Sequence, residues 1–363
     1  MGTDLNISKL NLKLVLSGLA MGIAIGVGVG YFVFAAEINP PIDSISANKY
    51  NEDPITMNQF RFLNPSIAYL DYSSIDLSSI EGMDSLLLHQ TETAQKSGKV
   101  SSAAIYYRDL TTNQKVGVNE SEVFSPGSLM KVPIMIAIYK YAEAKPHILE
   151  QKLLYTDSKE AEYLEMDKKS PKSNSKLIHG SEYTVSQLID IMIIESDNEA
   201  TIMLIDYIEE ESPQFLRSVE SELGMIIPDG IDFNENFITI RTYASFFRVL
   251  YNSSYLEKKY SELALETLSK TGYGFGIRQS IPQEIPVAHK YGVKPSKDNY
   301  IQLHHFGIVY HQKKPFLIGI MTKGKNIEHL KSFIAEVTST TFQRVDERAK
   351  KVSQNDFKKD IED

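Results

Sequence analysis

A serine and a lysine stand three residues apart in the run Phe124–Ile138, as Ser128 and Lys131. On a helix, residues three apart lie one turn apart on the same side, so these two side chains are expected to meet. A serine at a helix start lies near free backbone N–H groups that can stabilise a developing oxyanion. A buried lysine there would have a lowered pKa and could act as a base. Alternatively, Ser128 is a helix cap, and Ser173–Lys176 repeats the spacing in a polar loop.

The second element that could carry chemistry is the run Ser196–Asn198, which reads Ser-Asp-Asn and follows an apolar stretch. It separates two expected helices. A hydroxyl and an amide separated by one residue would project from the same loop, with Ser196 relaying a proton and Asn198 holding a substrate amide. Alternatively, Ser196 or Asn198 caps the following helix.

The third element pairs a lysine with a glycine, and the part of the chain that follows Asn198 offers two versions. Lys270–Gly272 reads Lys-Thr-Gly, and Lys290–Gly292 reads Lys-Tyr-Gly. Lys270 ends a helical run, and Gly272 is placed to end that helix. Lys290 ends a run with strand character, and a turn at Pro295 and another strand follow. The strand setting favours Lys290.

The spacing of apolar residues predicts the elements that must position these motifs. Strands are expected at Val100–Leu110, Gln114–Val118, Val287–Tyr291, Ile301–Tyr310 and Phe316–Thr322. Helices are expected at Ser79–Ser97, Ser128–Ala144, Thr184–Ile194, Asn198–Ile208, Ile240–Tyr251, Ser261–Leu268 and from Glu328 to about Arg344. Two strand groups around a helical block predict an α+β fold, with an antiparallel five-stranded sheet flanked by helices and an inserted helical subdomain. The run Val132–Ile138 is apolar on every face, which predicts a buried central helix.

The three motifs together resemble a known family. Ser-x-x-Lys, then Ser-Asp-Asn, then Lys-x-Gly on a strand is the order found in penicillin-recognising serine hydrolases, and the chain is most similar to class A β-lactamases. The resemblance runs from about Val100 to Arg344. It implies a β-lactamase/transpeptidase-like fold, which agrees with the α+β arrangement expected above.

The resemblance implies a role for each residue of the first two motifs. Ser128 would attack a carbonyl and form an acyl-enzyme, with Lys131 taking its proton. Ser196 would pass a proton to the departing nitrogen. Asn198 would bind the substrate amide and order Lys131.

The third motif is implied to bind substrate. Lys290 would contribute positive charge for a substrate carboxylate, and Tyr291, Gly292 and Val293 would line the binding strand. The backbone N–H groups of Ser128 and Val293 would form the oxyanion hole, in which one donor is typically worth ~10²–10³ in rate. Tyr291 replaces a small hydroxyl residue of the family pattern, so its hydroxyl is expected several ångströms further out.

Deacylation is the step that the resemblance supports least. In class A enzymes, a glutamate on a loop between the second and third motifs activates the deacylating water. Residues 223–236 form the corresponding stretch and lack its Glu-x-x-Leu-Asn pattern. Asp229, Asp232 and Glu235 are the substitutes that this stretch offers. We therefore expect acylation at Ser128 with slow deacylation.

Composition removes other functional classes. The 363 residues include no cysteine, which excludes disulfides, a thiolate nucleophile and cysteine-based metal sites. The formal net charge of −9 argues against a nucleic-acid partner. His304 and His305 would point to opposite faces of a strand and cannot jointly hold a metal. We expect no metal and no cofactor, and His289 is expected to pack or hydrogen-bond beside Lys290.

The N-terminal part of the chain predicts a membrane anchor. Leu14–Ala36 is a run of 23 residues without a charge, long enough as a helix to cross a hydrocarbon core of ~30 Å. Lys9 and Lys13 precede it, so residues 1–13 would be a short cytoplasmic N-terminus and the catalytic domain would be extracytoplasmic at the cell membrane. The alternative is a signal peptide cleaved near Val33–Ala35, which would release a secreted protein.

A stripe of glycines follows one face of this predicted helix, because Gly18, Gly22, Gly26 and Gly30 recur every fourth residue. Small residues at this spacing let two membrane helices approach closely, which would pair two chains in a homodimer. Alternatively, the stripe reflects only the frequency of glycine in membrane helices.

Three further segments complete the expected organisation. Residues 37–78 form an extracytoplasmic tether, in which Phe60–Tyr72 is rich enough in apolar residues to lie against the domain. Residues 79–345 form the hydrolase domain. Residues 346–363 form a charged tail or a frayed helix end.

These inferences lead to one hypothesis and two alternatives. The hypothesis is a membrane-anchored serine hydrolase that opens β-lactam rings or related cell-wall amides. The first alternative is a slow D,D-peptidase of the penicillin-binding type, acting on peptidoglycan stem peptides. The second is a non-catalytic, membrane-tethered cell-wall-binding module, which the intact Ser128, Lys131 and Ser196 oppose and which Tyr291 and the missing glutamate favour.

Overall fold

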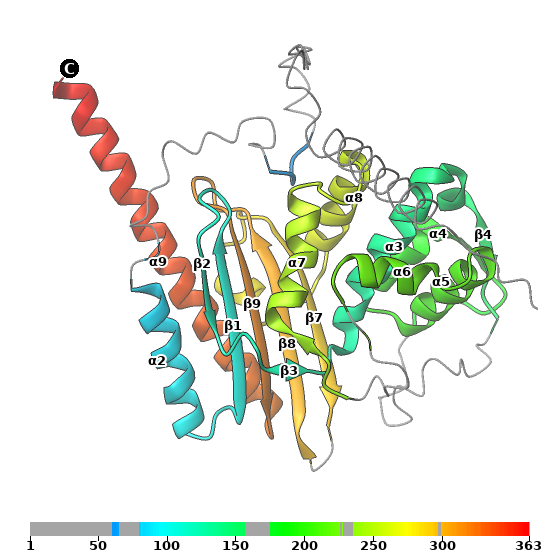
Figure 1. Cartoon of the computed structure of the whole chain (residues 1–363), viewed down its shortest axis with the longest axis horizontal. Coiled ribbons are helices and arrows are strands. Elements are labelled where there is room, and N and C mark those ends of the chain that lie inside the picture. Colours follow the sequence, from blue (N-terminus) through cyan, green and yellow to red (C-terminus); the bar gives the residue numbers. More distant parts are fainter. Residues whose placement is uncertain are drawn as a thin grey trace, which may run out of the picture. The chain divides into compact units, whose positions relative to one another are not determined.

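The computed structural model describes residues 60–64, 80, 82–156, 175–225, 227, 235–296 and 299–362, with side chains as far as residue 351. These residues belong to one compact unit, Met57–Asp363. Its centre is a five-stranded antiparallel sheet in the order β2-β1-β9-β8-β7 (Figure 1). The strands are β1 (Ser102–Asp109), β2 (Lys115–Val118), β7 (Val287–Pro295), β8 (Ile301–Val309) and β9 (Phe316–Gly324). The expected α+β fold with this sheet is confirmed.

Helices cover both faces of the sheet (Figure 1). On one face lie α2 (Met83–Lys96) and α9 (Ile327–Glu362). On the other face lies α7 (Ile240–Tyr251), and α8 (Lys258–Ser269) packs against α7 and the edge strand β7. The helical subdomain contains α3 (Lys131–Ala144), α4 (Val185–Ile194), α5 (Asn198–Glu211) and α6 (Phe215–Glu222). Short elements complete the chain: β3 (Val123–Phe124), η4 (Gly127–Met130), η5 (Pro146–Glu150), β4 (Lys152–Leu154), β5 (Glu182–Thr184), β6 (Ile238–Thr239) and η7 (Arg278–Ser280).

The sheet divides the apolar core into two clusters. Successive residues of a strand point to opposite faces, so Ala104 and Tyr106 of β1 face α7, whereas Ile105 and Tyr107 face α2 and α9. Because both faces are covered, the central strands are apolar at consecutive positions instead of alternating with polar residues. The edge strand β7 is the one that lies against η4, at the start of the helical subdomain.

Helix α3 is the buried central helix that its composition predicts. Every residue from Lys131 to Tyr139 is buried, and the helix contacts α4, α5, α6 and α8. An apolar surface on all sides is what a helix needs when other helices surround it. As a consequence, the first residue of α3, Lys131, is drawn into the interior.

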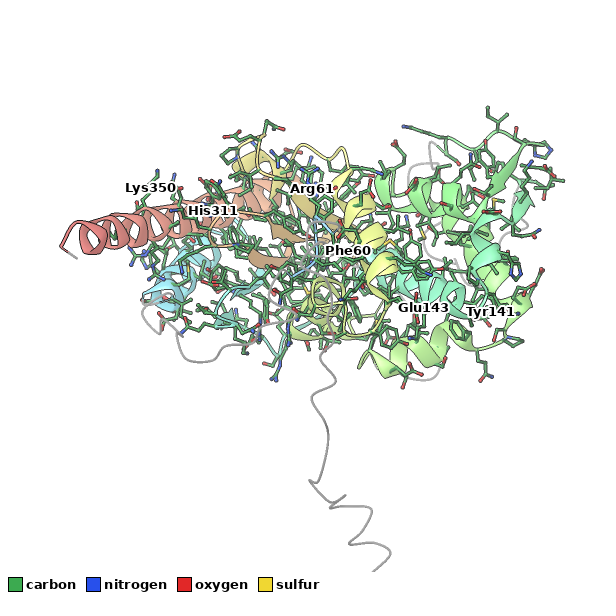
Figure 2. The ribbon with its side chains drawn as sticks, turned by 90° about the horizontal axis from the view of Figure 1, so that it is seen from above. Phe60, Arg61, Tyr141, Glu143, His311 and Lys350 are labelled. Carbon is green, nitrogen blue, oxygen red and sulfur yellow. The ribbon has the colours of Figure 1, made fainter. Side chains whose placement is uncertain are left out.

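The last helix is longer than its sequence pattern predicts. The closing helix was expected to end near Arg344, whereas α9 continues to Glu362 through the expected charged tail. Val337, Thr341, Val345 and Ala349 are all buried and recur every fourth residue, so one buried stripe carries the helix past Arg344. His311, in the β8–β9 loop, contacts Asp346 of α9. Asp346 also forms an ion pair with Lys350 at 2.7 Å, and Figure 2 labels His311 and Lys350.

The segment 60–64 lies against the domain, as expected for the start of the apolar run. The carboxylate of Glu262 in α8 accepts the backbone N–H groups of Arg61 and Phe62 at 2.7 and 2.9 Å. The ring of Phe62 meets Tyr310 edge to face, with 5.1 Å between centroids. Figure 2 labels Phe60 and Arg61 in this segment. Residues 65–72 lie outside the described residues.

Among the described residues, no helix is both long and apolar enough to span a bilayer. The expected anchor Leu14–Ala36, with its glycine stripe, lies outside the described residues, as does most of the expected tether 37–78.

Candidate active site

Ser128 and Lys131 lie where the 3₁₀ turn η4 runs into α3. Ser128 is the second residue of η4, and Lys131 is the first residue of α3. The Nζ atom of Lys131 lies 3.5 Å from the Oγ atom of Ser128. The N-cap positions of η4 and α3 are Pro126 and Met130, so Ser128 is not the helix cap that the alternative interpretation assigns to it.

The turn between α4 and α5 brings Ser196 and Asn198 to the same lysine. The Nζ atom of Lys131 lies 2.5 Å from the carbonyl oxygen of Ser196, 2.7 Å from Oδ1 of Asn198 and 3.3 Å from Oγ of Ser196. The cap of α5 is Asp197, whose Oδ1 accepts the backbone N–H of Ala200 at 3.0 Å. The alternative that Ser196 or Asn198 caps this helix is therefore wrong. Ser196 has a left-handed backbone, with φ 56°, a conformation that costs energy in a non-glycine residue.

Lys290 reaches this cluster from β7. Its Nζ atom donates to the Oγ atom of Ser196 at 2.8 Å, and the lysine is completely buried. Lys270 lies at the end of α8 instead, half-exposed and paired with Glu266 at 2.9 Å. Of the two lysine–glycine runs in the sequence, the structure brings only Lys290 to Ser196.

Burial changes the protonation of both lysines. Desolvation lowers the pKa of Lys131 to about 7, against the opposing effect of the negative charge on Asp197. Desolvation also lowers the pKa of Lys290 well below its usual range, and the positive charge of Lys131 lowers it further. A neutral amine is therefore accessible at Lys131 near neutral pH, which is what a general base requires.

The backbones of η4 and β7 touch at two glycines. A Cβ atom on Gly292 would lie 2.5 Å from the carbonyl oxygen of Pro126. Gly127 has a positive φ of 53°, and its Cβ would lie 2.7 Å from the carbonyl oxygen of Val293. This contact sets the segments of Ser128 and Val293 side by side. The oxyanion hole formed by their two N–H groups stays a prediction.

The strand β8 holds the chain just before η4. The Oε1 atom of Gln302 accepts the backbone N–H of Ser125 at 3.0 Å, and Nε2 of His304 lies 3.0 Å from the carbonyl oxygen of the same serine. Burial lowers the pKa of His304 to about 4, so it is a neutral donor here. His305 points to the other face, toward His289, as the strand pattern predicts. Among the described residues, no group of His, Asp and Glu side chains could hold a metal ion.

The ring of Tyr291 packs against two aromatic residues of the segment that precedes β7. Its half-buried ring packs edge to face against Tyr273 and Phe275, with centroids 4.1 and 4.9 Å apart. The Nζ atom of Lys290 lies 5.1 Å from the centroid of the Tyr291 ring. Tyr291 therefore belongs to an aromatic cluster beside Lys290, and the outward position of its hydroxyl stays a prediction.

Tyr273 is a site residue that the motifs did not indicate. Its ring centroid lies 5.4 Å from Nζ of Lys290 and 4.1 Å from the ring centroid of Tyr291. Burial raises its pKa well above the usual range, so the phenol keeps its proton. The one sequence signal is position: Tyr273 follows Lys270–Gly272 directly, in a glycine-rich run before β7.

Of the three candidate carboxylates for deacylation, one belongs to the described residues. Asp229 and Asp232 lie outside the described residues, and Glu235 is exposed. Asp197, an acidic residue beside Lys131, uses both carboxylate oxygens in hydrogen bonds. Its Oδ1 atom caps α5, and its Oδ2 atom accepts the backbone N–H of Lys176 at 3.2 Å.

Residues 89–345, which include all three motifs of this site, match the β-lactamase enzyme family. The chain belongs to the β-lactamase enzyme family. It is a serine hydrolase of the β-lactamase type, which acts on amide bonds. No curated protein sequence matches this β-lactamase family member.

Solved structures share the fold of this family member at low sequence identity. PBP-A is 18% identical over 72% of this chain and 96% of its own, with a TM-score of 0.60. A class A β-lactamase from Mycobacterium abscessus is 19% identical over 71% of this chain and 98% of its own, with a TM-score of 0.59. The extended-spectrum β-lactamase TLA-1 is 18% identical over 72% of this chain and 99% of its own, with a TM-score of 0.61.

Proposed function

We propose that this chain forms an acyl-enzyme at Ser128 with a β-lactam or a D-Ala-D-Ala-like cell-wall amide. The observation that carries the proposal is the hydrogen bonding of Lys131. A neutral amine has two N–H bonds and one lone pair. Two acceptors, the carbonyl oxygen of Ser196 and Oδ1 of Asn198, lie 2.5 and 2.7 Å from Nζ. They take the two N–H bonds and leave the lone pair for the hydroxyl proton of Ser128.

The proposed acylation balances its protons within the cluster. The oxygen of Ser128 forms a bond to the substrate carbonyl carbon as its proton moves to Nζ of Lys131. When the carbon–nitrogen bond breaks, Ser196 gives its hydroxyl proton to the departing nitrogen. Lys131 then returns a proton to Ser196 across the 3.3 Å between Nζ and Oγ. Both residues end the step in the state in which they began it.

The remaining side chains would hold the substrate. Asn198 uses its amide oxygen on Lys131, so its amide N–H groups are left to bind a substrate carbonyl. Lys290, which hydrogen-bonds to Ser196, would contribute positive charge toward a substrate carboxylate, because the carboxylate would itself favour the protonated lysine. Tyr291, Gly292 and Val293 would form the wall beside it. The N–H groups of Ser128 and Val293 would stabilise the oxyanion.

We propose further that deacylation is slow. Within the described residues, the carboxylate of Asp197 beside Lys131 is used to cap α5, and Glu235 is exposed. A penicillin adduct should therefore persist. A β-lactamase with rapid turnover and a slow D,D-peptidase remain the alternatives that the experiment below separates, with a non-catalytic wall-binding module as the third outcome.

The proposed location follows from the N-terminal sequence. An uncleaved helix at residues 14–36 would keep the hydrolase domain outside the cell membrane, where cell-wall amides occur. Pairing through Gly18, Gly22, Gly26 and Gly30 would give a homodimer of anchors. Secretion after cleavage is the alternative location.

Labelled penicillin tests the proposal directly. The purified full chain is incubated with the probe and followed by intact mass, beside Ser128→Ala and the matched surface variant Ser218→Ala. We expect a lasting adduct on the wild type and on Ser218→Ala, and none on Ser128→Ala. Release of D-alanine from a D-Ala-D-Ala peptide would identify a peptidase. Loss of intact drug without a lasting adduct contradicts slow deacylation, and the absence of both adduct and ring opening contradicts the enzyme proposal.

A further inference from the structure

The carbonyl group of Leu129 lies between the two residues proposed for acylation, Ser128 and Lys131. In an α-helix, this oxygen would accept the backbone N–H of the residue four positions on, which here is Pro133. Proline has no N–H, so the helical partner of the Leu129 carbonyl is missing. The N–H of Lys131 is shared between the carbonyl oxygens of Ser128 and Leu129, which leaves the Leu129 oxygen a lone pair for a further donor.

A buried tyrosine of α7 supplies that donor. The hydroxyl of Tyr243 donates to the carbonyl oxygen of Leu129 at 2.9 Å, and neither side chain is exposed. Burial raises the pKa of Tyr243 well above its usual range, so the phenol keeps the proton that it donates. Polar groups at this depth are costly unless they are hydrogen-bonded, and these two groups satisfy each other.

Aromatic rings connect Tyr243 to the centre of the sheet. Its ring meets Phe306 of β8 edge to face, with 4.4 Å between centroids, and meets Phe246 of α7 at 5.3 Å. Phe306 in turn covers Gly319 of β9, where a Cβ would overlap the ring. Figure 1 shows α7 lying against the sheet. The Tyr243 hydroxyl is therefore held in place by the packed interior.

Leu129 is also held from the side of β7. A Cβ on Gly292 would lie 2.9 Å from Cγ of Leu129 and 3.0 Å from its backbone nitrogen, so the strand backbone lies directly against this residue. The N–H of Leu129 donates to the carbonyl oxygen of Pro126 at 3.2 Å. Tyr243 adds a contact on the remaining polar group, the carbonyl.

The direction of this carbonyl affects the geometry of the proposed nucleophile and base. A peptide unit is planar, so holding its oxygen fixes the direction of the whole unit. For the unit between Leu129 and Met130, this restricts ψ of Leu129 and φ of Met130. Both rotations lie between Ser128 and Lys131 in the chain. They therefore help to set the 3.5 Å distance between Oγ of Ser128 and Nζ of Lys131.

We propose that Tyr243 is a positioning residue for acylation: by holding the carbonyl that a proline leaves without a helical partner, it fixes Ser128 relative to Lys131. The inference rests on the proposed acyl transfer at Ser128. Tyr243 takes no part in the proton transfers, because its own proton stays in the hydrogen bond to Leu129. The effect is therefore expected in the rate of acylation and not in the binding of the substrate.

Tyr243→Phe tests the inference, since it removes the hydroxyl and keeps the ring against Phe306. The full chain is reacted with increasing concentrations of labelled penicillin, well below the midpoint of thermal unfolding of each variant. The limiting acylation rate and the half-saturating concentration are measured. We expect a limiting rate at least about tenfold lower, because small displacements of reacting groups are costly in rate, with the half-saturating concentration within about twofold.

Tyr260→Phe is the matched control at the other end of α3. The buried hydroxyl of Tyr260 donates to the carbonyl oxygen of Ala142 at 3.0 Å, and the residue four positions after Ala142 is again a proline, Pro146. Each variant leaves one such carbonyl without its donor, so both should lower the midpoint of thermal unfolding by a few degrees. Only Tyr243→Phe should lower the limiting rate. A normal rate in Tyr243→Phe, or an equal loss of rate in Tyr260→Phe, overturns the inference.

Pro133→Ala completes a double-mutant cycle. This variant has a backbone N–H four residues after Leu129, which takes the place of the missing hydroxyl. In the Pro133→Ala background, Tyr243→Phe should therefore change the limiting rate by less than about threefold. A full loss of about tenfold in that background means that the effect does not pass through the Leu129 carbonyl, and it overturns the inference. All of these outcomes leave acylation of the wild type intact, whereas its absence overturns the proposed function and this inference with it.

Discussion

Lys131 is surrounded by oxygen atoms that suit both of its protonation states. As an ammonium it can donate to the carbonyl of Ser196, to Asn198 and to the Ser128 hydroxyl. As an amine it keeps the first two bonds and accepts a proton from Ser128. Burial favours the neutral form and is the larger effect, whereas the negative charge of Asp197 favours the charged form, and the resulting pKa of Lys131 is about 7. A small change of pH near 7 therefore changes which partner donates in the hydrogen bond between Ser128 and Lys131.

The first prediction is a pH profile set by this lysine. Below pH ~7 the limiting rate of acylation by labelled penicillin should fall about tenfold per pH unit, because a protonated Lys131 cannot accept the Ser128 proton. Above pH ~8 the rate should level off. The measurement is mass spectrometry of the full chain after the reaction has been quenched at set times, from pH 5 to 9, with the surface variant Lys270→Met as control. A rate that stays constant between pH 5.5 and 8 rules out Lys131 as the base.

At the scale of elements, the site forms where three backbone segments are forced together. The first helix turn of α3 contributes Lys131, and the α4–α5 turn contributes Ser196 and Asn198 because Asp197 between them caps α5. The edge strand β7 approaches η4 closely enough that Gly292 has no room for a side chain. Each segment is short, and its position depends on the larger element that it terminates.

The second prediction concerns this contact between β7 and η4. Gly292→Ala should lower the acylation rate at least tenfold, because its Cβ would lie 2.5 Å from the carbonyl oxygen of Pro126 and would push the two segments apart. The variant should still show a cooperative thermal transition. Gly98→Ala is the control, because a Cβ at Gly98 would meet no neighbouring atom whereas the φ of 72° is unfavourable for alanine. We expect the free energy of unfolding of this variant to fall by ~1 kcal/mol and its acylation rate to stay normal. Normal acylation in Gly292→Ala would show that the close approach has no catalytic consequence.

At the scale of the whole molecule, the fold is stabilised without covalent crosslinks. The sequence contains no cysteine, so two apolar clusters on either side of the sheet carry the stability. Three histidines on the strands of the central sheet, His289, His304 and His305, are buried. Desolvation lowers the pKa of His289 to about 3 and of His304 to about 4, and that of His305 well below its usual range. All three are neutral in the folded state.

The third prediction is a loss of stability in acid. The unfolded chain binds a proton at each of these histidines below pH ~6.5, whereas the folded chain does so only below about pH 4. Between these limits each histidine should cost the folded state about 1.4 kcal/mol per pH unit. Urea unfolding of the full chain at pH 7 and pH 5 measures the difference, with the exposed His329→Gln as control. Equal stability at the two pH values would mean that the imidazoles accept protons without unfolding.

Local patterns in the sequence were enough to determine the fold class and most of the candidate site. Helices and strands have periods that a window of ten residues reveals, and Ser128 and Lys131 are brought together by one helical turn. The strand setting of Lys290 separated it from the literal Lys-Thr-Gly at Lys270. The buried α3 and the opposite directions of His304 and His305 follow from the same local geometry.

Only the tertiary structure decided which groups surround those residues. Asp197 caps α5, which turns Ser196 and Asn198 toward Lys131, and no local pattern distinguishes the three as caps. Helix α9 passes Arg344 because it packs on the sheet. The Tyr273 ring lies beside Lys290, in a segment whose ends hydrogen-bond to His289 and His305 of the sheet. Such contacts join residues far apart in the chain, so no local window of the sequence contains both partners.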